Sequence, residues 1–296
     1  MERCFTIGIS TRALFDLEKE HQIFETEGAE SYVRYQIAHE ADILKPGAAF
    51  PLIQAFLKLN ELDDSRQIEV VIMSKNSADA GLRIFHSIAY YGLDITRAAL
   101  TTGAPIAPYL TAYGVDLYLS YSDRDVKDAI ASGVAAGLLL PGPCRRTEPI
   151  HQIRIAFDGD AVLFSPEAER IFLEKGKEAF CDSEKEKALV PLAPGPFAHI
   201  LRLIARIQKV APVGSNPIRT ALVTARSAPA HERVIRTLQY WGVRIDEAFF
   251  LGGMDKSQVL SAFGAHIFFD DSEMNTQSAS KVVLSARVPV EIREVG

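Results

Sequence analysis

The sequence predicts an α/β protein made of two tandem, doubly wound units that derive from an internal duplication. Apolar segments of strand length alternate with segments of helical periodicity along the chain, which is typical of parallel sheets. The same order of segments occurs twice, with matching residues 150 positions apart. At 296 residues the chain is long enough to form two such units.

The repeat appears both in single glycines and in longer stretches. VVIMSKNS (70–77) matches TALVTARS (220–227), and LKPGAAFPLIQAFLKL (44–59) parallels LAPGPFAHILRLIARI (192–207). Three glycine pairs share the offset of 150: Gly92 and Gly242, Gly103 and Gly253, and Gly114 and Gly264. Unrelated α/β units share an order of strands and helices but not a constant register, so we infer a duplication.

Each half is expected to begin with a strand, followed by a helical insert and a second strand. The predicted strands are Phe5–Ile9 and Val70–Met73 in the first half, and Ile153–Phe157 and Ala221–Val223 in the second. An amphipathic helix comes next, and in the second half Val234, Leu238 and Trp241 share its apolar face.

Three further elements complete the second unit. We expect a short strand at Ala248–Leu251, a short helix after Asp255 and a strand at His266–Phe269. The proposed boundaries are residues 1–140 for the first unit, a Pro- and charge-rich linker at 141–152, and 153–296 for the second. A helical insert at about residues 165–218 is expected in the second unit.

Composition limits the class of protein. The formal net charge of −6 and the pI near 5.7 argue against a nucleic-acid-binding surface. Cys4, Cys144 and Cys181 are scattered without metal-ligand spacing, which fits a reducing compartment. The N-terminal stretch MERCFTIGIS is not a signal peptide, and Val134–Leu140 is too short to span a bilayer. We therefore expect a cytoplasmic protein.

Polar side chains follow the predicted strands of the second half. Asp158 and Asp160 follow the first strand, Thr224 ends the second, and Asp270 and Asp271 end the last. Lys256 begins the short helix after the third strand. Because the carboxyl ends of parallel strands meet at a switch point, these groups are expected in one crevice.

Each of these residues also has a simpler structural explanation. Asp158-Gly159-Asp160 alone is a common turn, Thr224 and the aspartate pair are common helix caps, and Lys256 alone is a common surface residue. Taken together they favour chemistry, because converging carboxylates repel one another unless a cation lies among them. Oxygen ligands suit Mg²⁺, and a hydroxyl with a lysine suits a phosphoryl group. The set predicts Mg²⁺-dependent phosphoryl transfer.

The same residues resemble the four motifs of the haloacid-dehalogenase-like phosphatases, in their order. FDGDAVLFSPEAERIF, LVTARSAP and HIFFDD, with ISTRALFDLE and LKPGAAFPL, look more closely like the cytosolic 5′-nucleotidase I family, over nearly the whole chain. The resemblance implies two HAD-like (Rossmannoid) units, the second catalytic and carrying a small helical cap. It also implies hydrolysis of nucleoside 5′-monophosphates through an aspartyl-phosphate intermediate.

The resemblance also assigns roles to residues. Asp158 would be the nucleophile and Asp160 the general acid and base. Thr224 would hydrogen-bond the phosphate and Lys256 would neutralise it. Asp270, with Asp271, would hold Mg²⁺ together with Asp158 and the backbone carbonyl of Asp160. The substrate-binding residues expected beside them are Gly159, Ala225 and Arg226.

Substrate recognition is less determined by the sequence. Phe164, Phe172 or Phe197 would stack on a base or belong to the core, and Arg226 would contact the substrate or solvent. The histidines show no metal spacing and are taken as structural. The expected partner is a small-molecule nucleoside monophosphate, with no nucleic acid and no membrane, and the sequence allows a homo-oligomer. The alternative functions are a phosphatase for a sugar phosphate and a non-catalytic nucleotide sensor.

The first half lacks the catalytic set. The segment GISTRALF (8–15) replaces the aspartates, Ile106 stands at the offset of Lys256, and Ser120 and Tyr121 stand at those of Asp270 and Asp271. Only a hydroxyl, Ser74, is retained. Its polar strand ends are Ser10, Thr11, Arg12, Ser74, Lys75 and Asn76. These residues would cap helices, or they would form a nucleotide-binding or regulatory pocket suited to an anion. A third alternative is that Arg12 or Lys75 reaches the active site of the neighbouring half.

Overall fold

The computed structural model describes residues 4–62, 66–140, 148–211 and 215–290, and the chain divides into two compact units. Unit 1 is Met1–Leu139 with Arg145–Ile150, and unit 2 is Leu140–Cys144 with His151–Gly296. Of the predicted linker at 141–152, residues 141–147 lie outside the described part of the chain.

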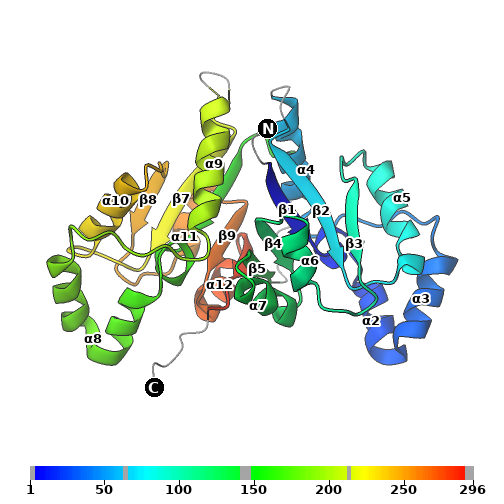
Figure 1. The fold of residues 1–296 in the computed structure, drawn as a ribbon, viewed down its shortest axis with the longest axis horizontal. Coiled ribbons are helices and arrows are strands. Elements are labelled where there is room, and N and C mark those ends of the chain that lie inside the picture. The colour runs from blue at the N-terminus through cyan, green and yellow to red at the C-terminus, as the bar shows by residue number, and fades with distance from the viewer. Residues whose placement is uncertain (1–3, 63–65, 141–147, 212–214, 291–296) are drawn as a thin grey trace. The chain divides into compact units, whose positions relative to one another are not determined.

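Unit 1 is a parallel sheet with flanking helices (Figure 1), and its strand order is β3-β2-β1-β4-β5. Its strands are β1 (Phe5–Ile9), β2 (Ile68–Ser74), β3 (Arg97–Leu100), β4 (Leu117–Ser120) and β5 (Ala135–Leu139). Its helices are α1 (Thr11–Leu14), α2 (Glu18–Glu27), α3 (Ala29–Ala38), α4 (Phe50–Lys58), α5 (Leu82–Tyr90), α6 (Ala107–Ala112) and α7 (Asp123–Ala131), with short turns η1 (Leu59–Glu61) and η2 (Ala78–Ala80).

Unit 2 has the corresponding strand order, β10-β9-β6-β7-β8, and its strands are also parallel. Its strands are β6 (Ile153–Phe157), β7 (Ile218–Thr224), β8 (Glu247–Phe250), β9 (Ile267–Asp270) and β10 (Leu284–Arg287). Its helices are α8 (Glu167–Glu186), α9 (Ala198–Val210), α10 (His231–Tyr240), α11 (Ser257–Phe263) and α12 (Glu273–Ala279), with the single turn η3 (Gly159–Leu163).

The structure confirms the predicted alternation of strands and helices and adds a strand to each unit. The first strand of each unit has the predicted bounds. The prediction that four strands complete each unit was wrong, because β5 and β10 pair in parallel with β4 and β9. These strands, AAGLL and LSAR, are short and contain no β-branched residue, so they lack the usual sequence signal of a strand.

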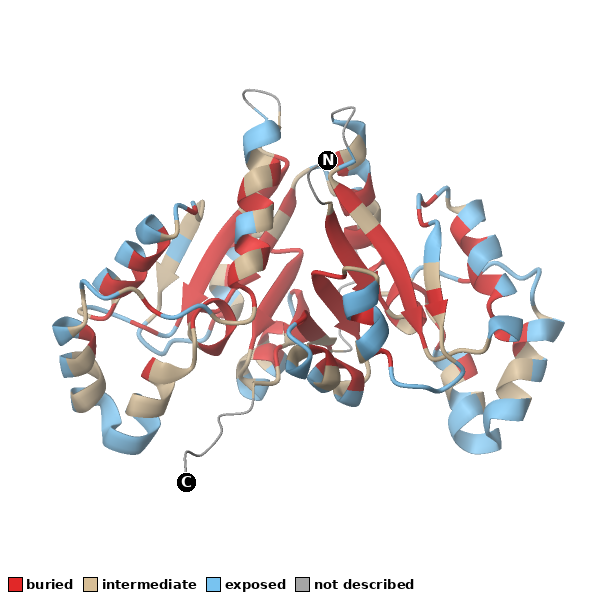
Figure 2. Ribbon diagram, viewed as in Figure 1, coloured by how far each residue is buried: buried red, intermediate tan, exposed pale blue. Residues whose placement is uncertain are grey.

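The apolar residues that predicted the strands form the cores of the two sheets. Every residue of β1 and β9 is buried, and β6 has only Arg154 partly exposed. Figure 2 shows buried strands and helices whose outer faces are exposed. Strands covered on both faces read as continuous apolar runs, which explains why these segments do not alternate.

The strand order of each unit creates a switch point at its centre. From β6 the chain moves outward to β7 and β8, and then returns to the other side of β6 for β9 and β10. The crevice between β6 and β9 is where α/β sheets of this kind bind ligands. In unit 1 the equivalent crevice lies between β1 and β4.

Two helices, α8 and α9, lie in the range where the helical insert of unit 2 is expected. Helix α8 lies beyond the carboxyl ends of the strands (Figure 1) and bends at Gly176, which has φ of 81° and ψ of −178°. Helix α9 was expected in the same insert. Six of its residues are buried along one face, so it packs against the body of unit 2. Unit 1 has the same bend at Gly28 between α2 and α3, with φ of 86°.

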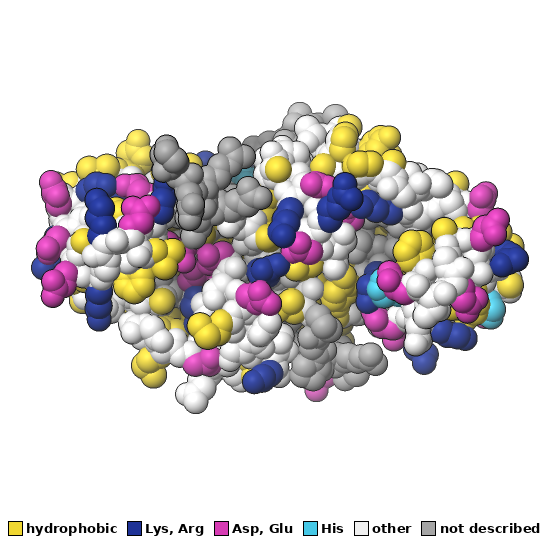
Figure 3. Space-filling model, turned by 90° about the horizontal axis from the view of Figure 1, so that it is seen from below, with side chains coloured by type: hydrophobic (Ala, Val, Ile, Leu, Met, Phe, Trp, Pro, Cys, Tyr) yellow, Lys and Arg dark blue, Asp and Glu magenta, His cyan; other side chains and the backbone are white. Residues whose placement is uncertain are grey.

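The surface is mixed in charge. Figure 3 shows Lys and Arg side chains interspersed with Asp and Glu on this face of each unit, and the described residues there form no broad basic patch. Within the described ranges, no helix has both the length and the apolar character needed to cross a bilayer.

Candidate active site

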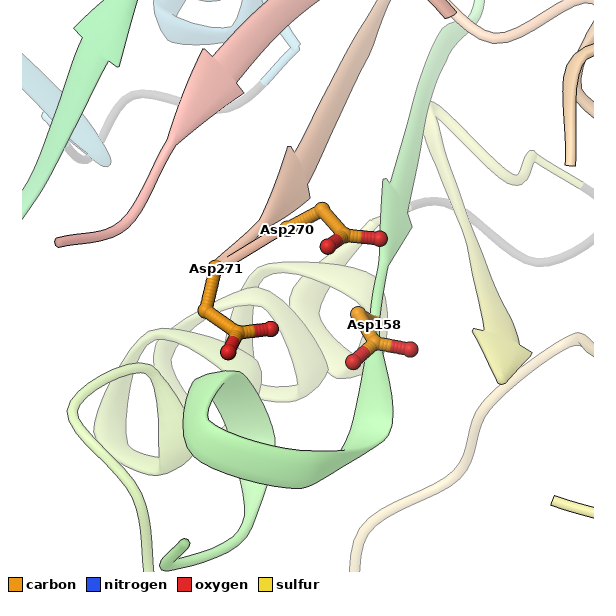
Figure 4. A group of neighbouring side chains, drawn as sticks. All are labelled: Asp158, Asp270 and Asp271. Carbon is orange, nitrogen blue, oxygen red and sulfur yellow. The ribbon is translucent and has the colours of Figure 1, made fainter. Parts of the chain in front are cut away.

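The predicted carboxylates of unit 2 meet at the switch point. Strand register pairs Phe157 of β6 with Phe269 of β9, so the residues that follow, Asp158 and Asp270, are level at the strand ends. The Asp158 amide donates to the Phe269 carbonyl at 2.8 Å, which fixes this alignment. Figure 4 shows the carboxyl groups of Asp158, Asp270 and Asp271 directed toward a common space.

The turn after β6 is tight and places two carboxylates close together. Asp160 is extended, with φ of −70° and ψ of 143°, and Ala161 has a positive φ of 59°. The Phe164 amide closes the turn on the Gly159 carbonyl at 2.8 Å. A Cβ at Gly159 would lie 3.3 Å from the Thr224 hydroxyl, so glycine allows the two strand ends to approach closely.

Lys256 lies between two of the carboxylates. Its ammonium group donates to Asp158 Oδ1 and to Asp270 Oδ2, both at 2.6 Å, and its side chain is 3% exposed. Burial lowers the pKa of Lys256, but the charges of Asp158 and Asp270 outweigh burial and raise it overall. The lysine is therefore a fixed positive charge inside the site, and the surface alternative considered for it is wrong.

The aspartates fit a cation site. Asp158, Asp270 and Asp271 each offer a carboxylate oxygen, and these atoms lie within 4.8 Å of one another. Burial raises the pKa of Asp158 to about 7, with Lys256 opposing and Asp270 reinforcing the shift. Burial and the neighbouring carboxylates, Asp158 first, raise the pKa of Asp271 to about 8. Burial thus disfavours the ionised carboxylates and their mutual repulsion adds to this, and a hard cation with oxygen ligands relieves both.

Asn275 is a member of the site that the sequence analysis missed. Its amide nitrogen donates to Asp270 Oδ1 at 3.3 Å and to Oδ2 at 3.2 Å, and the Ser272 amide donates to Oδ1 at 2.8 Å. Asp270 is fully buried, and these donors with Lys256 hold it in place. The available signal was that Asn275 lies in the first turn of the helix after HIFFDD.

Asp160 points into a different set of contacts. The guanidinium of Arg226 binds both of its oxygens, with Nε and Nη2 each at 2.7 Å. Arg226 also binds Glu184 of α8, and Glu184 binds Arg233 of α10. The solvent-exposed alternative for Arg226 is wrong, because the residue is 4% exposed. Neither Glu184 nor Arg233 was identified from the sequence.

Thr224 is at the carboxyl end of β7 and is buried. Its hydroxyl accepts a hydrogen bond from the Arg226 amide at 3.2 Å and lies beside Gly159. Ala225 follows it and lines the cavity in front of the carboxylates. The structure thus brings together the residues that the sequence predicted for a phosphoryl group.

A cavity of about 490 Å³ opens in front of these groups. One side is polar, with Asp158, Thr224 and Lys256, and the other is formed largely by α8 and α12. The lining from these two helices is Glu169, Phe172, Lys177, Phe180, Cys181, Met274 and Asn275. A cavity that joins an anion-binding end to an apolar wall suits a phosphorylated small molecule.

The aromatic residues considered for base stacking have different positions. Phe172 is 47% exposed and lines the cavity. Phe164 and Phe197 are fully buried and pack on Trp241 and on Phe157 and Phe269, so both belong to the core. His266 is structural, since its Nδ1 accepts from the Arg154 amide.

The strand ends at the equivalent crevice of unit 1 carry hydroxyl groups, and the nearby Lys75 is paired with a carboxylate. Ser10 follows β1, Ser74 ends β2 and bonds Thr11 at 3.3 Å, and Ser120 ends β4. Lys75 forms an ion pair with Asp125, and Arg12 is bound by Glu18 at 2.9 Å. Both cations considered for the neighbouring site therefore have carboxylate partners within their own unit.

Comparison with known proteins gives a family for this arrangement. The model of a family described as 5′-nucleotidase matches residues 1–295. Human cytosolic 5′-nucleotidase 1B is 38% identical in an alignment of 292 positions, and the match covers 95% of this chain and 48% of that protein. The chain thus spans about half the length of this relative. A histidinol dehydrogenase from Elizabethkingia anophelis gives a TM-score of only 0.26 at 9% identity, over 96% of this chain and 80% of that one, and carries no argument.

Proposed function

The chain belongs to the 5′-nucleotidase family, and from this membership we propose that it hydrolyses nucleoside 5′-monophosphates to a nucleoside and phosphate. The observation that carries the proposal is the buried group formed by Asp158, Asp270 and Lys256 at the switch point. A nucleotide sensor has no need of a buried nucleophile held by a lysine, so this group supports an enzyme.

In the first step, an Asp158 carboxylate oxygen attacks phosphorus and the bond between phosphorus and O5′ breaks. The proton that the leaving O5′ needs comes from the carboxyl group of Asp160. Lys256 and the Thr224 hydroxyl carry the charge that the phosphoryl oxygens develop. Gly159 and Ala225 supply backbone close to the same oxygens, and this step yields a nucleoside and an aspartyl phosphate.

In the second step, water attacks the phosphorus of the aspartyl phosphate and gives its proton to Asp160. The bond between phosphorus and the Asp158 oxygen breaks, which releases phosphate and restores both carboxyl groups. Asp160 gives its proton to O5′ in the first step and takes a new proton from water in the second, so its protonation state returns to its starting point.

The cofactor that we propose is Mg²⁺, and the residues fit it. Asp158, Asp270 and Asp271 offer oxygen ligands only, and the backbone carbonyl of Asp160 follows the same strand. Bound there, Mg²⁺ would neutralise the anionic phosphate and favour attack by an anionic nucleophile.

Three wider proposals accompany this function. We infer that the two units arose by duplication, because their strand orders correspond and their glycine bends at Gly28 and Gly176 match. We assign catalysis to residues 153–296, a non-catalytic role to 1–140 and the cap to α8. Since the human relative is named cytosolic, we propose the same compartment.

The substrate is tested with nucleoside 5′-, 3′- and 2′-monophosphates beside sugar phosphates and p-nitrophenyl phosphate. The expected result is Mg²⁺-dependent release of phosphate with highest kcat/KM for a 5′-monophosphate. Preference for a sugar phosphate would retain the phosphatase chemistry and reject the nucleotidase. No release from any compound, with the protein folded and Mg²⁺ present, would reject both.

A further inference from the structure

A bidentate arginine holds the proposed acid and base of the reaction. Arg226 donates from Nε to Asp160 Oδ2 and from Nη2 to Asp160 Oδ1, both at 2.7 Å. Two parallel bonds fix the plane of the carboxyl group as well as its position. The side chain of Asp160 is 18% exposed and lines the cavity, so the arginine sets how this group faces a substrate.

The third nitrogen of Arg226 connects the same guanidinium to the cavity wall. Its Nη1 binds Glu184, which lies near the end of α8, while the Phe180 ring of α8 lies 5.4 Å from the guanidinium carbon. Phe172, Phe180 and Cys181 of this helix line the cavity. One buried side chain therefore connects the orientation of Asp160 to the helix that forms the wall.

Unit 1 shows that Arg226 is not needed to attach such a helix. Arg83 of α5 binds Gln36 of α3 at 3.1 Å and Glu20 of α2 at 2.6 Å, as Arg233 of α10 binds Glu184 at 2.7 Å. Arg83 and Arg233 are 150 positions apart, and the residue 150 positions before Arg226 is Asn76. The arginine of the carboxylate contact is thus present only in the unit with the aspartates.

We propose that Arg226 is a positioning residue that orients Asp160 for proton transfer and, through Glu184, ties this orientation to helix α8. The proposal rests on the proposed function, and it gives Arg226 a role other than direct substrate binding. Substrate contacts that fix the position of α8 at the cavity would then also fix the orientation of the Asp160 carboxyl group. A lysine has no bidentate geometry and cannot replace it.

The test uses two substrates that differ in their need for an acid. The leaving O5′ of a nucleoside monophosphate needs a proton, whereas p-nitrophenolate is a weak base and leaves without one. For Arg226→Gln we expect the rate of nucleoside release in the first turnover to fall on the order of 10²-fold. The nitrophenolate burst should fall by less than about 10-fold, since nucleophilic attack is unaffected.

Arg233→Gln is the matched control. It removes a guanidinium from the same buried Glu184 but leaves both bonds between Arg226 and Asp160 in place. It should lower thermal stability and reduce the rates with the two substrates by the same factor. Arg226→Lys should restore stability without restoring the nucleotide rate, and Arg226→Gln should add little to the loss caused by Asp160→Asn.

The outcomes separate the two levels of the proposal. Two results would overturn the positioning role and leave the proposed nucleotidase function standing. One is an equal loss of rate with both substrates for Arg226→Gln, and the other is a loss of rate that simply adds to that of Asp160→Asn. Wild-type protein without activity on any nucleotide would instead reject the proposed function. If Arg226→Gln does not fold, Arg226→Lys, which keeps a positive charge beside Glu184 but has no bidentate geometry, gives the same comparison.

Discussion

The two units have the same strand order but different residues at the ends of their strands. Unit 1 therefore serves as an internal control for unit 2. After the first strand, unit 2 has Asp158 and unit 1 has Ser10; at the end of the fourth strand, unit 2 has Asp270 and unit 1 has Ser120. Both versions fold around a buried parallel sheet. The fold therefore does not require these carboxylates, and the cost of burying them points to chemistry.

The strongest test of this difference removes the nucleophile from unit 2. Asp158→Asn should lower turnover of nucleoside monophosphates by about 10⁴-fold or more, the scale of losing a nucleophile in other hydrolases. The measurement is phosphate release at saturating Mg²⁺, with circular dichroism as a check on folding. The control, Ser10→Ala, should change the rate by less than about twofold. A large loss for Ser10→Ala would mean that unit 1 takes part in catalysis.

The second test concerns the lysine. Lys256→Met should reduce turnover by about 10²- to 10³-fold, because a preorganised positive charge is lost from a buried site. Ile106→Met at the equivalent position of unit 1 should keep full activity and cost less than about 1.5 kcal/mol. Steady-state kinetics of the two variants at one Mg²⁺ concentration decide the matter. Equal activities would show that Lys256 has no electrostatic role.

The third test follows stability with pH in metal-free protein. Burial raises the folded pKa of Asp158 to about 7 and that of Asp271 to about 8, above their usual value of 3.8. The folded state then binds more protons than the unfolded state between these limits, so stability should fall as pH rises through this window.

Mg²⁺ should reverse this loss, with the larger increase in melting temperature at about pH 8 than at about pH 5. At one hundred times its dissociation constant, the ion should add about 2.7 kcal/mol. Asp270→Asn should abolish the Mg²⁺ effect, and Ser120→Ala in unit 1 should retain it. An identical Mg²⁺ shift at both pH values would contradict the carboxylate site.

The smallest expected difference is in stability, between glycine-to-alanine substitutions in two equivalent turns. Each unit has a Pro-Gly turn bridged to the first loop, with Phe15 opposite Pro46 and Phe164 opposite Pro194. A Cβ at Gly195 would meet the Val162 and Phe164 carbonyls at 2.5 Å, whereas a Cβ at Gly47 would meet backbone at 2.9 Å.

Gly195→Ala should therefore destabilise by about 3 kcal/mol and Gly47→Ala by about 1 kcal/mol. Urea unfolding of both variants gives the comparison. The reverse order would show that unit 2 tolerates a shift of this turn better than unit 1.

Prediction from sequence succeeded where the signal lies in a short stretch of the chain. The continuous apolar run before Asp158 predicted β6, and the parallel order of strands predicted that Asp158 and Asp270 would be neighbours. The roles of these residues stay predictions. The fifth strand of each unit was missed because AAGLL and LSAR carry little strand signal.

Prediction failed where a role depends on contacts far apart in the chain. Nothing beside Glu184 in the sequence indicates that it lies buried between Arg226 and Arg233, 42 and 49 positions away. The different packing of α8 and α9 was also not predicted, because both are amphipathic and only burial shows that α9 has six buried residues along one face. Such pairings follow from packing of the whole unit rather than from local pattern.

The bridging lysine has a consequence for the charge that a bound cation would balance. Ionised Asp158, Asp270 and Asp271 carry three negative charges and Lys256 carries one positive charge, so the group has a net charge of −2. A divalent ion brings this sum to zero, while a monovalent ion leaves a residue of −1 and a trivalent ion an excess of +1. Lys256 would therefore lower by one the negative charge that a cation bound among these three carboxylates has to balance.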